Sequence, residues 1–206
     1  MNSLLKTSIT LILAVFLFGL VLQACKSSKP QRIEDKKETL TQKSMINYLK
    51  LGDSITKKVQ SQLITVLESA IAQKGTHGAV ELCHLKALPL VDSLSKTYHC
   101  QIRRVSNKFR NPQDKPQNDI EKSTLEAFLT KFKNQEPLEP FIVESGKEVY
   151  YFKPIMIATP TCLKCHGDKN KDIDPQTLAA IKKLYPNDLA KDYKIKDFRG
   201  MWSIKF

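Results

Sequence analysis

The chain has 206 residues, with 33 lysines and arginines against 21 aspartates and glutamates, and its formal net charge is +12. This length supports one domain with one hydrophobic core. The positive excess favours anionic lipid headgroups or an acidic protein partner. No nucleic-acid partner is expected, because the basic residues are not interleaved with aromatic ones as in nucleic-acid-binding segments.

The first 24 residues have the pattern of an export signal. Lys6 precedes an apolar run from Ile9 to Leu22, and Leu22-Gln23-Ala24-Cys25 resembles a bacterial lipobox. Cleavage before Cys25 would leave that residue lipidated at the new N-terminus. The alternative is an uncleaved membrane anchor, although the apolar run is shorter than a bilayer-spanning helix needs. We predict a signal peptide at 1–24, lipidation of Cys25, and attachment to the periplasmic side of a bacterial membrane.

A polar segment follows the predicted lipidation site. Residues 26–43 are rich in Lys, Ser, Gln and Glu and contain few apolar side chains, so they cannot bury enough surface to order themselves. We predict a flexible tether over 25–50 and a single folded domain over 51–206.

Helices are expected at the start of the folded part. Apolar residues at helical spacing predict a first helix from Ser54, and Lys74 to Gly78 breaks the pattern. A second helix is expected from near His77, with Cys83 on its apolar face and a bend at Pro89. We therefore expect an N-terminal helical pair.

Strands and two further helices follow. Strands are expected at 101–106, at 141–144 and 148–152 as a hairpin, and at 199–206, where Trp202, Ile204 and Phe206 alternate. Asn118 and Glu121 resemble a capping box, and Asp174-Pro175 has the pattern of a helix start. Helices followed by an antiparallel sheet predict an α+β domain.

The most specific motif is Cys162-Leu163-Lys164-Cys165-His166, which has the Cys-x-x-Cys-His spacing of c-type haem attachment. Two thiols at this spacing add to the two vinyl groups of one porphyrin, and the adjacent imidazole reaches the iron. We predict one covalent haem c in an attachment loop, with Cys162 and Cys165 as tethers and His166 as an iron ligand.

Two other interpretations of this motif were weighed. A structural zinc site needs a second pair of ligands, and the sequence has no other Cys-x-x-Cys. A thioredoxin-like dithiol would follow a strand in a βαβ unit, whereas this motif follows two prolines. The redox dithiol remains the main alternative.

The residues leave several candidates for the second iron ligand. The candidates are Cys83, Cys100, His77, His84, His99, Met156 and Met201. Cys83 lies on an apolar helix face, and His84 is turned about 100° away from it. Three roles for Cys83 stay open: an iron ligand, a disulfide partner of Cys100, and a small buried thiol without chemistry.

Several stretches together resemble the Tll-like haem-binding domain family. They are Ala79 to Cys83, Ile102 to Ser106 with Arg110-Asn111-Pro112, Lys153-Pro154-Ile155, the haem motif, Leu184-Tyr185-Pro186 and Phe198-Arg199-Gly200. The resemblance covers about residues 54–206. It implies a PAS-like antiparallel sheet with N-terminal helices, and a cysteine ligand opposite the histidine, at Cys83 and His166 in this chain.

Two functions follow from these expectations. The first is a redox or diatomic-gas sensor, with NO or CO as ligand and a separate protein that receives the signal. The alternative is a small electron-transfer cytochrome c with a redox partner. Enzymatic activity is not expected, because a peroxidase needs an open iron site. Arg103, Arg104, Arg110 and Arg199 are candidates to contact haem propionates.

Overall fold

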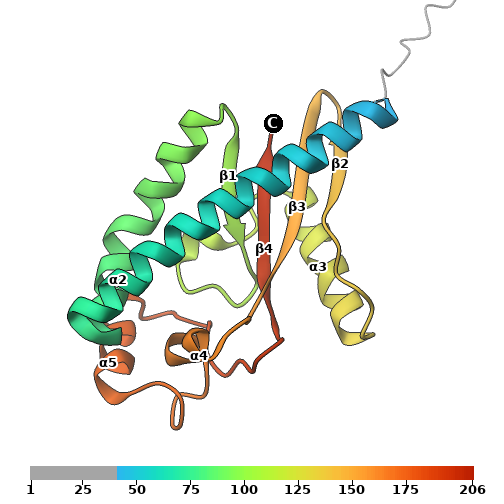
Figure 1. Cartoon of the computed structure of the whole chain (residues 1–206). Coiled ribbons are helices and arrows are strands. Elements are labelled where there is room, and N and C mark those ends of the chain that lie inside the picture. The colour runs from blue at the N-terminus through green and yellow to red at the C-terminus, as the bar shows by residue number, and fades with distance from the viewer. Residues whose placement is uncertain (1–40) are drawn as a thin grey trace, which may run out of the picture. The chain divides into compact units, whose positions relative to one another are not determined.

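The computed structural model describes residues 41–206, so the predicted signal peptide, Cys25 and the first part of the predicted tether lie outside the described residues. The described part combines helices with one antiparallel sheet, which confirms the expected α+β class (Figure 1). Its elements are α2 (Gln42–Thr97), β1 (Gln101–Val105), a 3-10 turn (Pro112–Asp114), α3 (Asp119–Lys133), β2 (Phe141–Ser145), β3 (Glu148–Met156), α4 (Pro160–His166), α5 (Pro175–Leu184) and β4 (Phe198–Lys205).

The sheet has four strands in the order β1-β4-β3-β2, and all neighbours are antiparallel. The C-terminal strand β4 therefore lies inside the sheet, between β1 and β3. The predicted hairpin is confirmed as β2 and β3, which are joined by Gly146 and Lys147. Gly146 has φ 64°, a conformation that glycine adopts without steric cost.

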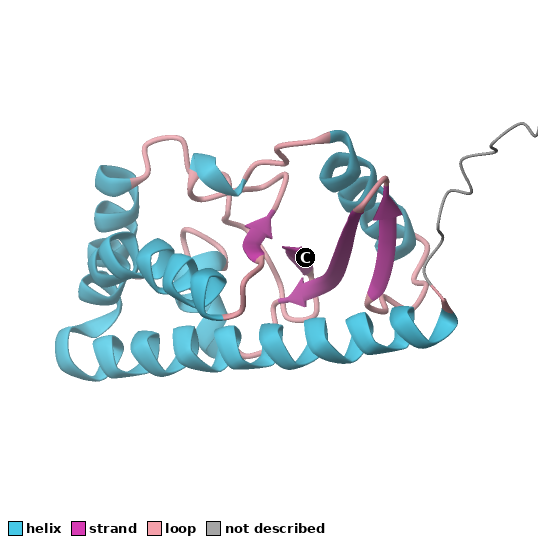
Figure 2. Cartoon of the chain, turned by 90° about the horizontal axis from the view of Figure 1, so that it is seen from above, coloured by secondary structure: helices cyan, strands magenta, loops and turns pink. Residues whose placement is uncertain are grey.

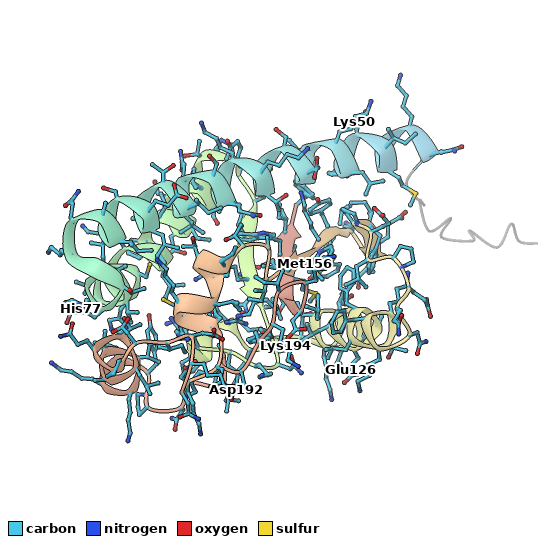
Figure 3. All side chains as sticks on the ribbon, turned by 60° about the horizontal axis from the view of Figure 1, so that its bottom comes forward. Lys50, His77, Glu126, Met156, Asp192 and Lys194 are labelled. Atoms are coloured by element: carbon cyan, nitrogen blue, oxygen red, sulfur yellow. The ribbon has the colours of Figure 1, made fainter. Side chains whose placement is uncertain are left out.

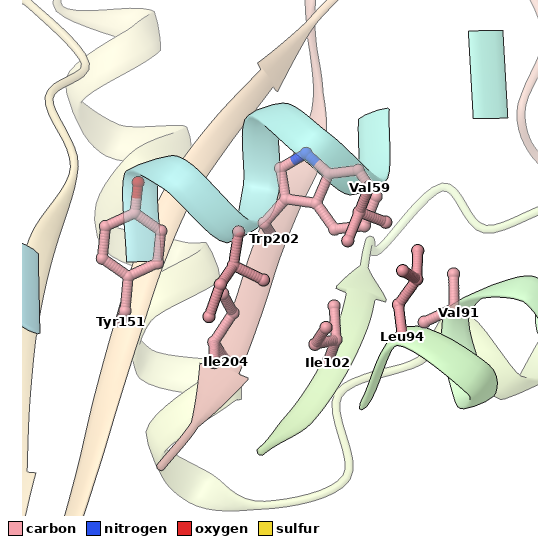
Figure 4. Close-up of a cluster of buried hydrophobic side chains, with 8 residues drawn as sticks. Val59, Val91, Leu94, Ile102, Tyr151, Trp202 and Ile204 are labelled. Atoms are coloured by element: carbon pink, nitrogen blue, oxygen red, sulfur yellow. The ribbon is translucent and has the colours of Figure 1, made fainter. Parts of the chain in front are cut away.

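Both faces of the sheet are covered. In Figure 2, α2 runs along one side of the strands and α3 lies on the other side. Trp202 and Ile204 of β4 belong to the cluster under α2, which also contains Ile55, Val59, Val91, Leu94, Ile102 and Tyr151 (Figure 4). Phe206 packs against this cluster beyond the end of β4, as the predicted alternation requires. Met201, on the opposite face, packs in a second cluster with residues of α3.

The long helix α2 starts earlier than the sequence indicated. Thr41 is its N-cap, with Oγ1 accepting a hydrogen bond from the N–H of Ser44 at 3.3 Å. The predicted start at Ser54 is therefore wrong, and residues 42–50 of the predicted tether are helical. This stretch was missed because Gln42, Lys43, Asn47 and Lys50 are polar and exposed and the apolar Ile46 is exposed as well, which weakens the apolar period.

The predicted break in the helical region is confirmed at one residue. Gly75 has φ 68° and ψ −178°, which is not helical, and the chain turns there into a second helical segment (Figure 1). Pro89 lies inside this second segment without ending it. In the second segment Val80, one turn before Cys83, packs in a cluster with Ile181 of α5.

The predicted caps are present. Asn118 Oδ1 accepts from the N–H of Glu121 at 2.8 Å, and Asp174 Oδ1 accepts from the N–H of Thr177 at 2.9 Å. The Glu121 carboxylate reaches the N–H of Gln117 at 2.8 Å, one residue earlier than in a capping box. No helix among residues 41–206 is long and apolar enough to cross a membrane.

Candidate functional site

The Cys-x-x-Cys-His motif lies on a short helix, not on the predicted loop. Helix α4 starts at Pro160, whose fixed φ suits the first helical position, and ends at His166. Residues three and four apart share a helix face, so Cys162, Cys165 and His166 project to one side. Cys165 packs in the cluster with Val80, and Cys162 packs in the cluster with Tyr193.

A loop after α5 holds His166 from both its ring and its backbone. Nδ1 of His166 lies 2.8 Å from the carbonyl oxygen of Ala190. A carbonyl only accepts hydrogen bonds, so Nδ1 carries the proton and Nε2 of the neutral ring keeps its lone pair. The N–H of Tyr193 donates to the His166 carbonyl at 3.0 Å, and the N–H of Asp192 donates to that of Gly167 at 2.9 Å. Figure 3 shows α4 between the bend of α2 near His77 and the loop with Asp192 and Lys194.

The surroundings of His166 keep its ring neutral. Burial holds the pKa of His166 well below its usual value, and the positive charges of Arg110 and Arg199 lower this pKa further. The hydrogen bond to Ala190 acts in the opposite direction and is weaker. A neutral imidazole with a fixed tautomer is the form that binds a metal.

Helix α2 brings Cys83 to the same place. Val80 lies one turn before Cys83 and packs in the cluster that Cys165 joins. Burial raises the pKa of the Cys83 thiol, while the charges of Arg104 and Arg110 oppose this shift. The pKa of Cys165 is also raised by burial, and Cys83 adds to that shift. Cys83 of α2 and Cys165 of α4 therefore lie close enough for their charges to interact.

Arg110 and Asp188 form a buried ion pair close to His166. The Arg110 Nε donates to Asp188 Oδ1 at 3.2 Å, and the Arg110 Nη2 donates to the carbonyls of Cys165 at 2.6 Å and Ala190 at 3.2 Å. Asp188 Oδ1 also accepts from the N–H of Ala190 at 2.9 Å. Both backbone polar groups of Ala190, its N–H and its carbonyl, are thus hydrogen-bonded.

Both the sequence and the structure of the chain resemble those of known proteins. A model of the family described as Tll0287-like matches residues 28–206. The chain belongs to the Tll0287-like family. Its structure is similar to the crystal structure of the cyanobacterial heme-protein Tll0287, with 23% sequence identity and a TM-score of 0.61. That match covers 78% of this chain and 94% of the other, and it supports a shared fold. No curated protein matches the chain.

In this member of the Tll0287-like family, the structure separates the candidates for a second ligand. Met156 and Met201 pack in the α3-side cluster, and Cys100 packs against the α2-side cluster. The His84 ring meets the Tyr185 ring edge-on, with centroids 5.0 Å apart. Among the described residues, Cys83 and Cys100 are both free thiols, so the disulfide alternative is not formed.

The histidines at the two ends of the second segment of α2 lie elsewhere. His77 follows the bend at Gly75, and His99 follows the end of α2 with φ 51°. Cys83 lies one turn after Val80, which packs in the cluster that Cys165 joins, and the charge of Cys83 acts on Cys165. Cys83 is therefore the best-placed partner for the motif on α4.

The arginines proposed as propionate contacts have different surroundings. Arg103 already has three hydrogen-bond partners. Its Nε donates to Glu121 at 3.1 Å, and its Nη2 donates to the carbonyls of Gln113 and Lys115 at 3.2 and 2.8 Å. These partners hold Arg103 on the α3 side of the sheet, which does not favour the predicted propionate contact. Arg110 is likewise engaged, with Asp188 and the two carbonyls described above.

Two arginines keep free donors. The Arg199 Nη1 donates to Ser106 Oγ at 2.9 Å and to the Lys108 carbonyl at 3.0 Å, but its Nε is buried without a partner. Arg104 has no hydrogen bond or ion pair among the described residues, although its charge acts on Cys83 and His166. A buried donor without an acceptor is costly, so Arg199 fits an anionic group placed at this site.

No group of three or more His, Cys, Asp or Glu side chains within residues 41–206 converges as a metal-ion site.

Asp188 and Ala190 were missed by the sequence analysis, because they lie in a loop without a motif and contact the site only through the fold. Their hydrogen bonds to Arg110 span 78 and 80 residues.

Proposed function

We propose that this chain is a single-haem c-type protein, with the haem joined to Cys162 and Cys165 and the iron bound by His166 and Cys83. The observation that carries this proposal is the His166 imidazole: neutral, fixed by Ala190 through Nδ1, and left with a lone pair on Nε2. Family membership and the likeness to a heme protein support it.

A haem bound here would supply reversible one-electron exchange and binding of diatomic gases. The attachment adds each thiol across one vinyl group, so a carbon–sulfur bond forms and the thiol hydrogen moves to the neighbouring carbon. His166 would donate its Nε2 lone pair, and Cys83 would bind as a thiolate, helped by the charges of Arg104 and Arg110. Arg104 and the free Nε of Arg199 would hold the propionates.

The test uses full-length protein matured in a bacterial host that attaches haem c. We expect a mass increase of one haem in the wild type and its loss in a Cys162→Ala, Cys165→Ala double variant. Electronic absorption and electron paramagnetic resonance should show a thiolate signature that disappears in Cys83→Ala. Cys100→Ala is the matched control, because Cys100 is a partly buried thiol in a different cluster. Wild-type protein without haem would contradict the proposal.

We infer a redox or diatomic-gas sensor as the physiological role. A thiolate ligand favours ferric iron and gives a low potential, so reduction, NO or CO would release Cys83 from the iron and free the second segment of α2. A separate signalling protein would respond to this change. A spectrum and potential that reductant, NO and CO leave unchanged would contradict this role.

The second candidate is an electron carrier, supported by the net charge of +12, which suits an acidic redox partner. Rapid and reversible electron exchange with a respiratory partner, with Cys83 remaining bound in both oxidation states, would favour it over the sensor. Peroxidase activity is not proposed, because two protein ligands leave no open iron position.

Export and lipidation complete the proposal. Cleavage before Cys25 and lipidation of its thiol would attach the domain to the periplasmic side of a membrane. Membrane fractionation and fatty-acid labelling of the wild type and of Cys25→Ala test this: both signals should be lost in the variant. Fatty-acid labelling of the Cys25→Ala variant would contradict the assignment of a lipobox.

A further inference from the structure

We propose that Arg110 and Asp188 form a positioning pair that fixes the orientation of His166 and sets the redox potential of the haem iron. This inference rests on the proposed haem site, and it assigns a role to two residues that do not bind the iron themselves.

The hydrogen bonds of the pair centre on one residue, Ala190. The Ala190 carbonyl accepts from His166 Nδ1 at 2.8 Å and from Arg110 Nη2 at 3.2 Å, while the Ala190 N–H donates to Asp188 at 2.9 Å. Arg110 and Asp188 also bind each other, through Nε and Oδ1 at 3.2 Å and through Nη2 and Oδ2 at 3.4 Å. The Ala190 carbonyl, which accepts the hydrogen bond from the imidazole, is therefore part of a closed ring of hydrogen bonds among Ala190, Arg110 and Asp188.

The same guanidinium holds the attachment helix. Arg110 Nη2 donates to the Cys165 carbonyl at 2.6 Å, next to His166 in the chain. One side chain thus joins the helix that carries the imidazole to the loop that orients it. Without Arg110, the Ala190 loop and α4 keep their backbone hydrogen bonds and the contact of the Tyr193 ring with His166, but they lose this side-chain link, and the imidazole plane gains freedom to rotate.

Burial gives both charges a strong effect. The side chain of Asp188 is 1% exposed and that of Arg110 is 13% exposed, so water screens them weakly. Lys191 also approaches the Asp188 carboxylate at 3.5 Å. The charge of Arg110 already acts on both Cys83 and His166, the two proposed iron ligands.

The two charges should act in opposite directions on the iron. A nearby positive charge disfavours ferric iron, which carries one more positive charge than ferrous iron, and therefore raises the potential. The Asp188 carboxylate favours ferric iron and lowers the potential. Because the two residues have similar positions but opposite charge, their single variants give a signature that loss of structure alone does not produce.

The experiment measures the midpoint potential and the electron paramagnetic resonance spectrum of full-length holoprotein. Arg110→Gln should lower the potential, Asp188→Asn should raise it, and the double variant should return close to the wild type. Both single variants should broaden the ferric signal, because the imidazole orientation is no longer unique. Arg110→Lys should restore most of the potential while the signal stays broadened, since ammonium keeps the charge but cannot donate to all the acceptors.

Arg103→Gln is the matched control. Arg103 forms a comparably buried pair with Glu121, at 3.1 Å, but on the α3 side of the sheet. Its loss should lower the unfolding temperature without moving the potential or the spectrum. Shifts of the same sign in Arg110→Gln and Asp188→Asn, or no shift in either, would overturn the inference. Absence of haem from the wild type would instead overturn the proposed function.

Discussion

Two adjacent arginines on one strand have different surroundings because they lie on opposite faces of the sheet. Arg103 and Arg104 lie side by side on β1, paired with Ser203 and Trp202 of β4. Successive side chains of a strand point to opposite faces. Arg103 therefore meets Glu121 on the α3 side, while Arg104 shares the α2 side with Trp202 and keeps its guanidinium free. The sequence shows two equal arginines, and only the register distinguishes them.

Arg103 is expected to contribute to stability through Glu121. The Glu121 side chain is 2% exposed, so Arg103→Leu leaves a buried carboxylate without its cation. We expect a loss of about 3 kcal/mol in the free energy of unfolding, measured by urea denaturation. The double variant Arg103→Leu, Glu121→Leu should recover most of this loss, because no buried charge remains. A double variant as unstable as the single one would contradict this explanation.

The motif residues could be singled out from the sequence because their spacing is a local signal. Cys162, Cys165 and His166 have a fixed spacing, and the spacing alone indicates the cofactor class. Arg110 and Asp188 have no such signal, since their contacts join segments 78 residues apart. Local chemistry is visible in a sequence, whereas a hydrogen-bond network across a fold is not.

At the scale of elements, the bend in α2 depends on a single glycine. The caps at Asn118 and Asp174 were predictable from residue types, but the start of α2 was not, because the exposed Ile46 and Leu51 weaken the apolar period of its first turns. Glycine within Lys74 to Gly78 did predict the break, and the structure assigns it to Gly75. This bend reverses α2 and so delivers Cys83 to the site.

Gly75→Ala is expected to destabilise the protein. The φ of 68° with ψ −178° belongs to a region that only glycine enters readily. Forcing alanine into it should cost about 1–3 kcal/mol in the free energy of unfolding, measured by chemical denaturation. Gln73→Ala, an exposed position just before the bend, is the control and should change stability little. Equal effects of the two substitutions would show that the bend is not constrained.

The cap of α5 gives a prediction with a pH dependence. Hydrogen bonds from the Thr177 hydroxyl and N–H hold the pKa of Asp174 below its usual value. A lowered folded-state pKa means that this stabilisation is present above the ordinary carboxyl pKa and is lost as pH falls through the folded value. Asp174→Ala should cost about 1 kcal/mol near neutral pH and progressively less in acid.

Urea denaturation of Asp174→Ala and the wild type, at neutral pH and below the ordinary carboxyl pKa, measures this difference. Asp92→Ala is the control, because Asp92 is an exposed aspartate inside α2 away from a helix start. A cost for Asp174→Ala that does not change with pH would show that the carboxylate charge has no part in the cap.

At the scale of the whole molecule, α2 is fitted closely to the sheet. Gly52 lies where a Cβ atom would approach the Tyr151 ring to 2.3 Å, and Tyr151 is fully buried. Gly52→Ala should therefore cost about 1–3 kcal/mol through overpacking, despite the better helix propensity of alanine. Thermal unfolding of this variant beside Ser54→Ala, an exposed position on the same helix, measures the effect. A stabilised Gly52→Ala protein would show that α2 can move away from the sheet.

The proposed bonds from the iron to Cys83 and His166 would also join two distant parts of the chain. Cys162, Cys165 and His166 are neighbours, so a covalent haem stays attached to them even in the unfolded chain. Only the bond from the iron to Cys83 would close a long loop, from α2 to α4. Such a bond acts as a cross-link and should stabilise the folded protein by about 4 kcal/mol when it persists in the unfolded state.

Cys83→Ala should therefore lose far more stability in the haem-loaded protein than in the protein without haem, where it only truncates one partly buried thiol. Chemical denaturation of both forms, with Cys100→Ala as the control in each, measures the difference. Cys100→Ala should have the same small effect in the two forms, because its thiol packs away from α4. An equal cost of Cys83→Ala with and without haem would mean that the iron does not bind Cys83, since the cross-link contributes only where that bond exists.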